Sequence, residues 1–88
     1  MKKLHPSLNE LKKEIGNTPV ADEAGKAKLS DLNEKIDLVL EDSSSIPGEH
    51  HASLLKSLRE AILHFEVTHP KLTSYINRIA GMLADMGI

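Results

Sequence analysis

Histidines are the residues of this 88-residue chain most able to do chemistry, because a neutral imidazole can bind a metal ion or act as a base near neutral pH. The chain has five of them. A helical zinc pair usually needs two histidines four positions apart, and no two histidines here have that spacing. His50 and His51 are adjacent, so on a helix their side chains diverge by about 100°. We therefore expect no metal site.

Two other histidines lie near the C-terminal third of the chain. His64 follows Glu60 by one helical turn, which predicts a pair of interacting surface side chains rather than a catalytic dyad. His69 directly precedes Pro70 and is expected to occupy the first turn of a helix. Neither position indicates a reactive group.

Nucleophilic catalysis and phosphate binding find no support in the sequence. A nucleophilic serine needs a base beside it in a pocket, whereas the serines here fall in a linker or at expected helix boundaries, where capping explains them. The glycines are too scattered for a phosphate-binding loop: Gly16, Gly25, Gly48, Gly81 and Gly87. The chain also has no cysteine for a disulfide or a thiolate metal site. We expect a protein that is not an enzyme and that binds no cofactor.

Charge and aromatic content narrow the range of partners. Eleven basic and thirteen acidic residues leave a formal net charge of -2, which gives no general attraction to nucleic acid. Phe65 and Tyr75 are the only aromatic residues, too few for base stacking. No apolar run approaches the roughly 20 residues that span a bilayer, and the N-terminus lacks the apolar block of a signal peptide. We expect a cytoplasmic protein without a membrane partner.

Apolar residues recur with a helical period along the chain, and no useful stretch alternates with period two. The predicted fold is therefore all-α. It is a small helical bundle of three main helices plus a short N-terminal helix, without strands, in a single domain over residues 1–88. The expected helices cover about residues 7–15, 20–42, 49–66 and 69–86, with breaks near residues 16–19, 43–48 and 68–70.

Local signals in the first half predict where helices start and end. Ser7 and Glu10 have the spacing of a capping box, and Gly16 suits the position after a helix end. Gly25 lies on the apolar face of the expected second helix, where a glycine costs about 1 kcal/mol relative to alanine. Either another backbone packs closely there, or the first turns of that helix are loose.

The start of the last helix has its own signals. Thr68 is predicted to be the N-cap, and Pro70 then lies in the first turn, where its missing N–H costs nothing. Val67 and Leu72 are predicted to form a hydrophobic staple around this cap.

The C-terminal stretch "FEVTHPKLTSYINRIAGMLADMGI" follows a short capped helix, a longer acidic helix and a Pro/Gly linker. In this it resembles a family of short bacterial helical proteins of unknown function (domain of unknown function 4404). Members of that family end in a closely similar F-E-V-[ST]-H-P-x-L-T run and in a terminus like N-M-G-I, where this chain has Asp85 in place of the asparagine. The likeness spans nearly the whole chain and is most specific at residues 65–70 and 86–88. It implies a bacterial, cytoplasmic, helical protein and implies no activity.

The last helix is more apolar than one neighbour requires. Its apolar residues are spaced like a short heptad seam, and two more widen the arc to roughly 160°. Folding of so short a chain buries only roughly 64% of the unfolded surface, so a second copy would add to the core. We therefore expect a non-catalytic interaction or scaffolding protein that self-associates as a homodimer, with Met82→Glu yielding a folded monomer. The expected interaction residues are Leu38, Leu63, Tyr75, Ile79, Met82 and Met86.

An alternative from another class is a nucleic-acid-associated regulator. The short elbow at Thr68, His69 and Pro70 would then be part of a helix-turn-helix. Against it, the last helix offers few basic or amide side chains for contact with bases. This alternative requires salt-sensitive binding in an electrophoretic shift titration at two salt concentrations.

Overall fold

A computed structural model describes residues 4–42 and 48–88, and these ranges form four α-helices and no strand. Helix α1 spans Leu4–Asn17, α2 Glu23–Glu41, α3 Glu49–Phe65 and α4 Pro70–Asp85. The all-α prediction is confirmed. The predicted break at residues 43–48 lies outside the described residues except for Gly48, which is the N-cap of α3. None of the described helices is both long and apolar enough to cross a membrane.

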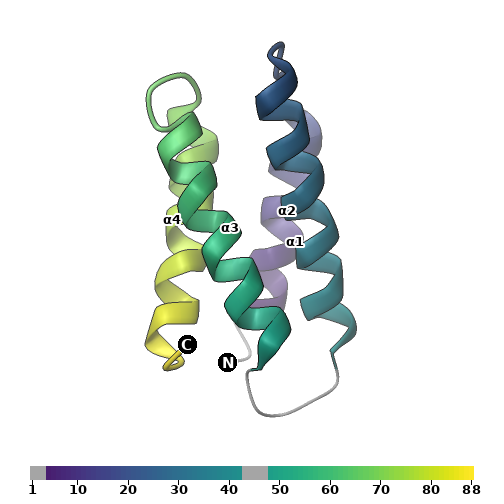
Figure 1. Cartoon of the computed structure of the whole chain (residues 1–88), viewed down its shortest axis with the longest axis vertical. Coiled ribbons are helices and arrows are strands. Elements are labelled where there is room, and N and C mark those ends of the chain that lie inside the picture. The colour runs from purple at the N-terminus through teal and green to yellow at the C-terminus, as the bar shows by residue number, and fades with distance from the viewer. Residues whose placement is uncertain (1–3, 43–47) are drawn as a thin grey trace.

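The four helices form an up-down-up-down bundle (Figure 1). α1 packs against α2 and α4, and α3 packs against the same two helices, so each helix has two neighbours. Because consecutive helices run in opposite directions, the α1–α2 and α3–α4 connections lie at one end of the bundle (Figure 1). The start of α1 and the end of α4 lie at the other end (Figure 1). Segments far apart in the sequence therefore meet where the two connections lie.

One apolar core lies between the helices, and every helix contributes to it. The helical spacing of apolar residues puts one stripe of each helix inside and its charged side chains outside. Phe65 is 0% exposed and sits at the end of α3, next to the α3–α4 connection. The other largest fully buried side chains are Leu8, Leu11, Leu32, Ile36, Val39, Leu54, Leu58, Leu72, Ile76, Ile79 and Leu83.

Helix α1 starts earlier than the sequence predicts, because its first turn carries a core residue. Leu4 is buried and continues the stripe of Leu8 and Leu11, so it stabilises a helical turn ahead of Ser7. The predicted capping box is therefore wrong: Ser7 lies inside the helix and is itself buried. Pro6 is tolerated in this first turn because the N–H groups there have no intrahelical acceptor.

Helix α1 also ends later than predicted. Gly16 is part of the helix, and Thr18 closes the last turn instead. The Thr18 hydroxyl donates to the carbonyl oxygen of Glu14 at 2.6 Å. The backbone N–H of Thr18 donates to the carbonyl oxygen of Ile15 at 3.3 Å. With 14 residues, α1 is a full member of the bundle, and it covers one side of α4.

Helix α4 starts one residue later than predicted. His69 is its N-cap and Pro70 its first residue, because the fixed φ of proline suits that position. The predicted cap by Thr68 is wrong, since the Thr68 hydroxyl contacts the His69 ring and not the first N–H groups of α4. The predicted staple is wrong as well, because Val67 is 85% exposed while Leu72 is buried.

The connection between α3 and α4 makes a helical hairpin. The two helices run side by side in opposite directions (Figure 1), whereas a helix-turn-helix sets its helices at about 90–120°. The apolar face of α4 is turned inward, towards α1 and α3. On its outer side, the Arg78 guanidinium lies 5.9 Å from the centre of the Tyr75 ring.

Candidate functional site

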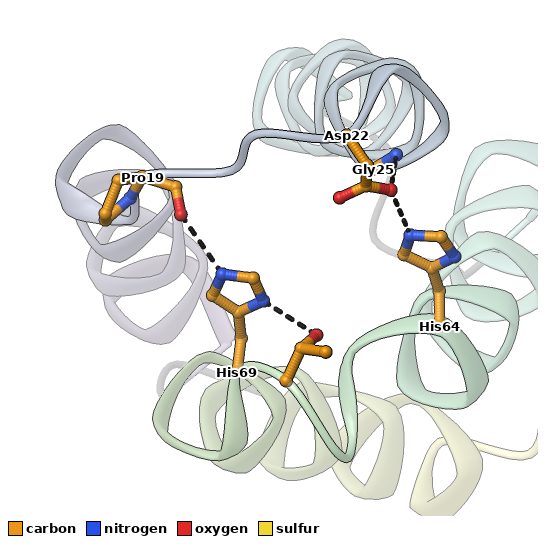
Figure 2. Close-up of polar contacts among 6 residues, drawn as sticks. Pro19, Asp22, Gly25, His64 and His69 are labelled. Carbon is orange, nitrogen blue, oxygen red and sulfur yellow. Dashed lines mark hydrogen bonds and ion pairs between the residues drawn. The ribbon is translucent and has the colours of Figure 1, made fainter.

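Two histidines join the connections that meet at one end of the bundle (Figure 2). His69 Nε2 lies 3.0 Å from the backbone carbonyl oxygen of Pro19, which is 50 positions away in the sequence. His64 Nε2 lies 2.8 Å from Asp22 Oδ2, which is 42 positions away. We call Pro19, Asp22, His64, Thr68 and His69 the loop-end cluster. It holds the α1–α2 hairpin to the α3–α4 hairpin.

In its neutral form, the His69 ring has one tautomer that satisfies both nitrogens. A carbonyl oxygen can only accept, so His69 Nε2 carries the proton that it donates to Pro19. Nδ1 of the neutral ring then accepts from the Thr68 hydroxyl at 2.9 Å. The ring also meets the buried Phe65 ring edge-on, with 5.5 Å between centroids and 81° between planes. The sequence placed His69 in the first turn of α4, but its ring reaches outward to the α1–α2 connection.

Asp22 is the acceptor at the centre of the other half of the loop-end cluster. As the N-cap of α2, it accepts the Gly25 N–H at 2.8 Å, and the same oxygen contacts His64 (Figure 2). The His64 hydrogen bond is the largest cause and the Gly25 N–H the second, and together they hold the pKa of Asp22 below its ordinary value. The predicted pairing of His64 with Glu60 does not form, because the His64 ring is taken by Asp22.

The preceding connection folds tightly over Gly25. A Cβ built on this glycine would lie 2.6 Å from Val20 Cγ1 and 2.8 Å from Asp22 Oδ1, which is too close for real atoms. The sequence left two explanations for this glycine, a close backbone or a loose first turn. The structure shows a third, since side chains and not backbone occupy the space. Gly25 allows the Asp22 cap and the His64 contact to form together.

The chemistry of the loop-end cluster is that of a set of fixed hydrogen bonds. Its histidines each use Nε2 on an acceptor of the α1–α2 connection, and both rings pack edge-on against Phe65. In the ranges 4–42 and 48–88, no three histidine, aspartate or glutamate side chains are placed to hold a metal ion. Every buried side-chain nitrogen or oxygen in those ranges has a hydrogen-bond partner.

A second polar set lies along the boundary between α2 and α3. Lys35 Nζ donates to Ser57 Oγ at 2.7 Å and to Asp31 Oδ2 at 3.1 Å. The Ser57 hydroxyl donates to the same Asp31 oxygen at 2.9 Å. A serine beside a lysine is one way to build a nucleophile. Here the serine is 5% exposed and directs its proton to Asp31, so the three groups fasten α2 to α3.

Towards the loop end, the same boundary opens into a hollow of about 430 Å³ lined by Lys28, Glu60, Leu63 and His64. Lys28 and Glu60 make no ion pair or hydrogen bond with any described residue. Leu63 is 77% exposed, and Val67, one turn further on, is 85% exposed. We call Lys28, Glu60, Leu63 and Val67 the α2–α3 outer face. It combines unpaired charges with exposed apolar side chains.

Another hollow, of about 310 Å³, separates the end of α1 from the start of α4, and it shows which side of α4 faces α1. Lys71 lines it together with Glu14. At 100° per residue, Tyr75, Met82 and Met86 lie within about 60° of Lys71 around α4, and all three are half-buried. The side of α4 that carries these three residues is therefore the side next to α1, and each of the three keeps part of its surface exposed.

The structure does not bring the six predicted interaction residues together. Ile79 is 1% exposed and belongs to the core, so its side chain cannot reach a partner. Leu38 is 40% exposed on α2, and the Asp31 to Ser57 contact places it opposite the first turns of α3. Leu63 lies about 15–20 Å further along the bundle. Leu38 and Leu63 therefore do not form one patch.

No pattern in the sequence predicts the contacts of Asp22, His64 and His69 across the bundle. The family model described as "Domain of unknown function (DUF4404)" matches residues 4–88. This chain belongs to that family. The matched range holds all four described helices, so the DUF4404 domain of this chain comprises the whole bundle together with its loop-end cluster. No curated protein and no solved structure matches the chain.

Proposed function

We propose that this protein is a non-catalytic interaction module that works as a homodimer. The observation that carries the proposal is the exposure of Leu63 and Val67, which are 77% and 85% exposed. Single exposed apolar residues are common on soluble proteins. Leu63 lies in the last turn of α3 and Val67 follows it by four positions in the connection, so burying both against a partner would favour association.

The size of the bundle supports self-association. A domain of 88 residues buries a small core and gains stability from further apolar burial. A two-fold homodimer is the simplest closed assembly that covers Leu63 and Val67, because one surface serves both chains. The buried polar side chains of the described residues are occupied by bonds within the bundle, which agrees with a role in contact and not in catalysis.

Self-association through α4 is the competing location for the contact. Tyr75, Met82 and Met86 keep part of their surface open, although α1 covers one side of α4. Methionine side chains adapt readily to a partner. If this edge is the interface, Met82→Glu produces a folded monomer.

Light scattering coupled to size exclusion tests the proposal. We expect the parent protein to have twice the mass of one chain at micromolar concentration and above. A mass of one chain throughout the micromolar to millimolar range would refute the homodimer. Circular dichroism of each sample shows whether the bundle is folded.

We further infer that the protein acts in the bacterial cytoplasm. The chain has no cysteine, so its fold needs no oxidising compartment. Fractionation of cells that carry the tagged protein tests this inference, which predicts recovery in the cytoplasmic fraction. Recovery in the periplasmic or membrane fraction would contradict it.

A further inference from the structure

We propose that the two copies meet through the α2–α3 outer face. Leu63 of each copy enters the hollow of the other, and Lys28 of each copy pairs with Glu60 of the other. This inference rests on the proposed homodimer and names its surface. Its occupant is a second copy of this chain.

The first argument is charge. Two acidic side chains along the α2–α3 boundary have partners within the chain: Asp22 contacts His64, and Asp31 contacts Lys35. Lys28 and Glu60 line the same hollow, carry opposite charges and contact no charged group of the described residues. They are therefore available to a surface that presents an acid and a base in the reverse order.

The second argument is symmetry. A two-fold axis that lies in the interface, runs along the bundle and passes midway between Lys28 and Glu60 brings the two positions together. Lys28 of each copy then faces Glu60 of the other, and both pairs form at once. An axis that instead ran across the bundle would place like charges opposite each other, so the charges favour the first alignment.

The third argument is shape. Leu63 is 77% exposed and lines a shallow, widely open hollow of about 430 Å³ between α2 and α3. An open surface of this kind can admit the leucine of a second copy. Val67, in the connection that follows α3, adds another exposed apolar side chain near the loop end. The arrangement gives an apolar centre with charged side chains beside it, as in most protein interfaces.

The first experiment compares Leu63→Glu with a matched control, Leu38→Glu. Both change an exposed leucine on the outside of the bundle, and Leu38 lies at the other end of the same boundary. Leu63→Glu should weaken the dimer by at least roughly a hundred-fold, since both copies lose the apolar contact and gain a charge at its centre. Leu38→Glu should change the dissociation constant less than about three-fold, because a surface substitution outside the interface has little effect.

The second experiment tests the reciprocal charge pairs. Lys28→Glu alone and Glu60→Lys alone each replace two attractions by two repulsions, and each should weaken the dimer by roughly ten-fold. In a mixture of these two variants, both contacts of the mixed dimer are attractive again. Mixing should therefore restore association, which native mass spectrometry or fluorescence exchange between labelled chains can measure.

The outcomes separate this inference from the proposed function. A monomeric parent defeats both. A dimeric parent whose Leu63→Glu variant remains dimeric, while Met82→Glu is monomeric, preserves the homodimer and overturns the α2–α3 outer face. Failure of the mixed charge variants to associate, in a parent dimer that Leu63→Glu disrupts, overturns the Lys28 to Glu60 pairing.

Discussion

Replacing Gly25 by alanine tests the packing of the α1–α2 connection on α2. Alanine is normally the better residue inside a helix, by about 1 kcal/mol relative to glycine. The structure predicts the opposite sign at this position. A Cβ on residue 25 would lie 2.6 Å from Val20 Cγ1 and would also meet both carboxylate oxygens of Asp22.

The size of the effect follows from what must move. Val20 packs against the core, and the Asp22 carboxylate is held by the Gly25 N–H and by His64. Overpacking of a well-packed site typically costs about 1–3 kcal/mol, which exceeds the gain in helix propensity of about 1 kcal/mol. We expect Gly25→Ala to lower the free energy of unfolding by about 1 kcal/mol, or the melting temperature by about 4–8 °C.

Gly81→Ala is the matched control. Gly81 is exposed in α4, and nothing lies within 4 Å of a Cβ built there. This substitution should raise the free energy of unfolding by about 0.5–1 kcal/mol. Urea denaturation of the parent and both variants, followed by circular dichroism, measures the two changes. A Gly25→Ala protein as stable as the parent, or more stable, would show that the connection moves aside freely and that its close packing on Gly25 imposes no constraint.

Three further substitutions test the remaining contacts. The pKa of Asp22 is lowered in the fold, so the ionised carboxylate stabilises the protein above the ordinary pKa of 3.8. This stabilisation is lost as the pH falls through the pKa of the folded state. Between about pH 5 and pH 2, the free energy of unfolding measured in urea should therefore fall less for Asp22→Asn than for the parent. His69→Ala should lower the free energy of unfolding by about 1 kcal/mol, because the hydrogen bond to Pro19 is lost. Thr68→Ala should lower it by less than about 0.5 kcal/mol, because Thr68 is exposed and caps no N–H. Equal losses for the two variants in thermal melts would contradict this assignment. Leu8→Ala should cost about 2–5 kcal/mol, and a negligible cost would mean that α1 does not dock.

Helical periodicity was enough to predict the four helices and most of their buried faces. Each apolar stripe faces the core for a local reason, since residues three and four apart share one side of a helix. Leu54, Leu58 and Phe65 illustrate this: their spacing puts them on one face of α3, and all three are fully buried. Helix ends were predicted less well, because they depend on contacts beyond the local sequence. The burial of Leu4 lengthens α1, and although Leu4 has helical spacing with Leu8 and Leu11, the capping-box pattern at Ser7 and Glu10 predicted a later start.

The loop-end cluster could not be predicted from local patterns because its bonds join residues 42 and 50 positions apart. Bundle topology is the missing information. In an up-down-up-down arrangement, the first and third connections lie at the same end, so a polar residue near one can reach a residue near the other. The wide apolar arc of α4 has a partial explanation in the same topology, because α4 packs against two helices, α1 and α3.

The side chains of residues 65–70 have different roles in the fold. Phe65 fills the core, His69 joins the two hairpins, and Pro70 starts α4. These roles account for three of the six residues through the fold of a single chain. Val67 is different, because it is apolar, 85% exposed and without a part in the core or in the loop-end cluster. A solvent-exposed valine in a connection adds nothing to the stability of one bundle, and Val67 follows Leu63 by four positions at the end of α3. The fold thus gives roles to Phe65, His69 and Pro70, whereas a role for Val67 requires the proposed homodimer, and a monomeric protein would leave this valine without one.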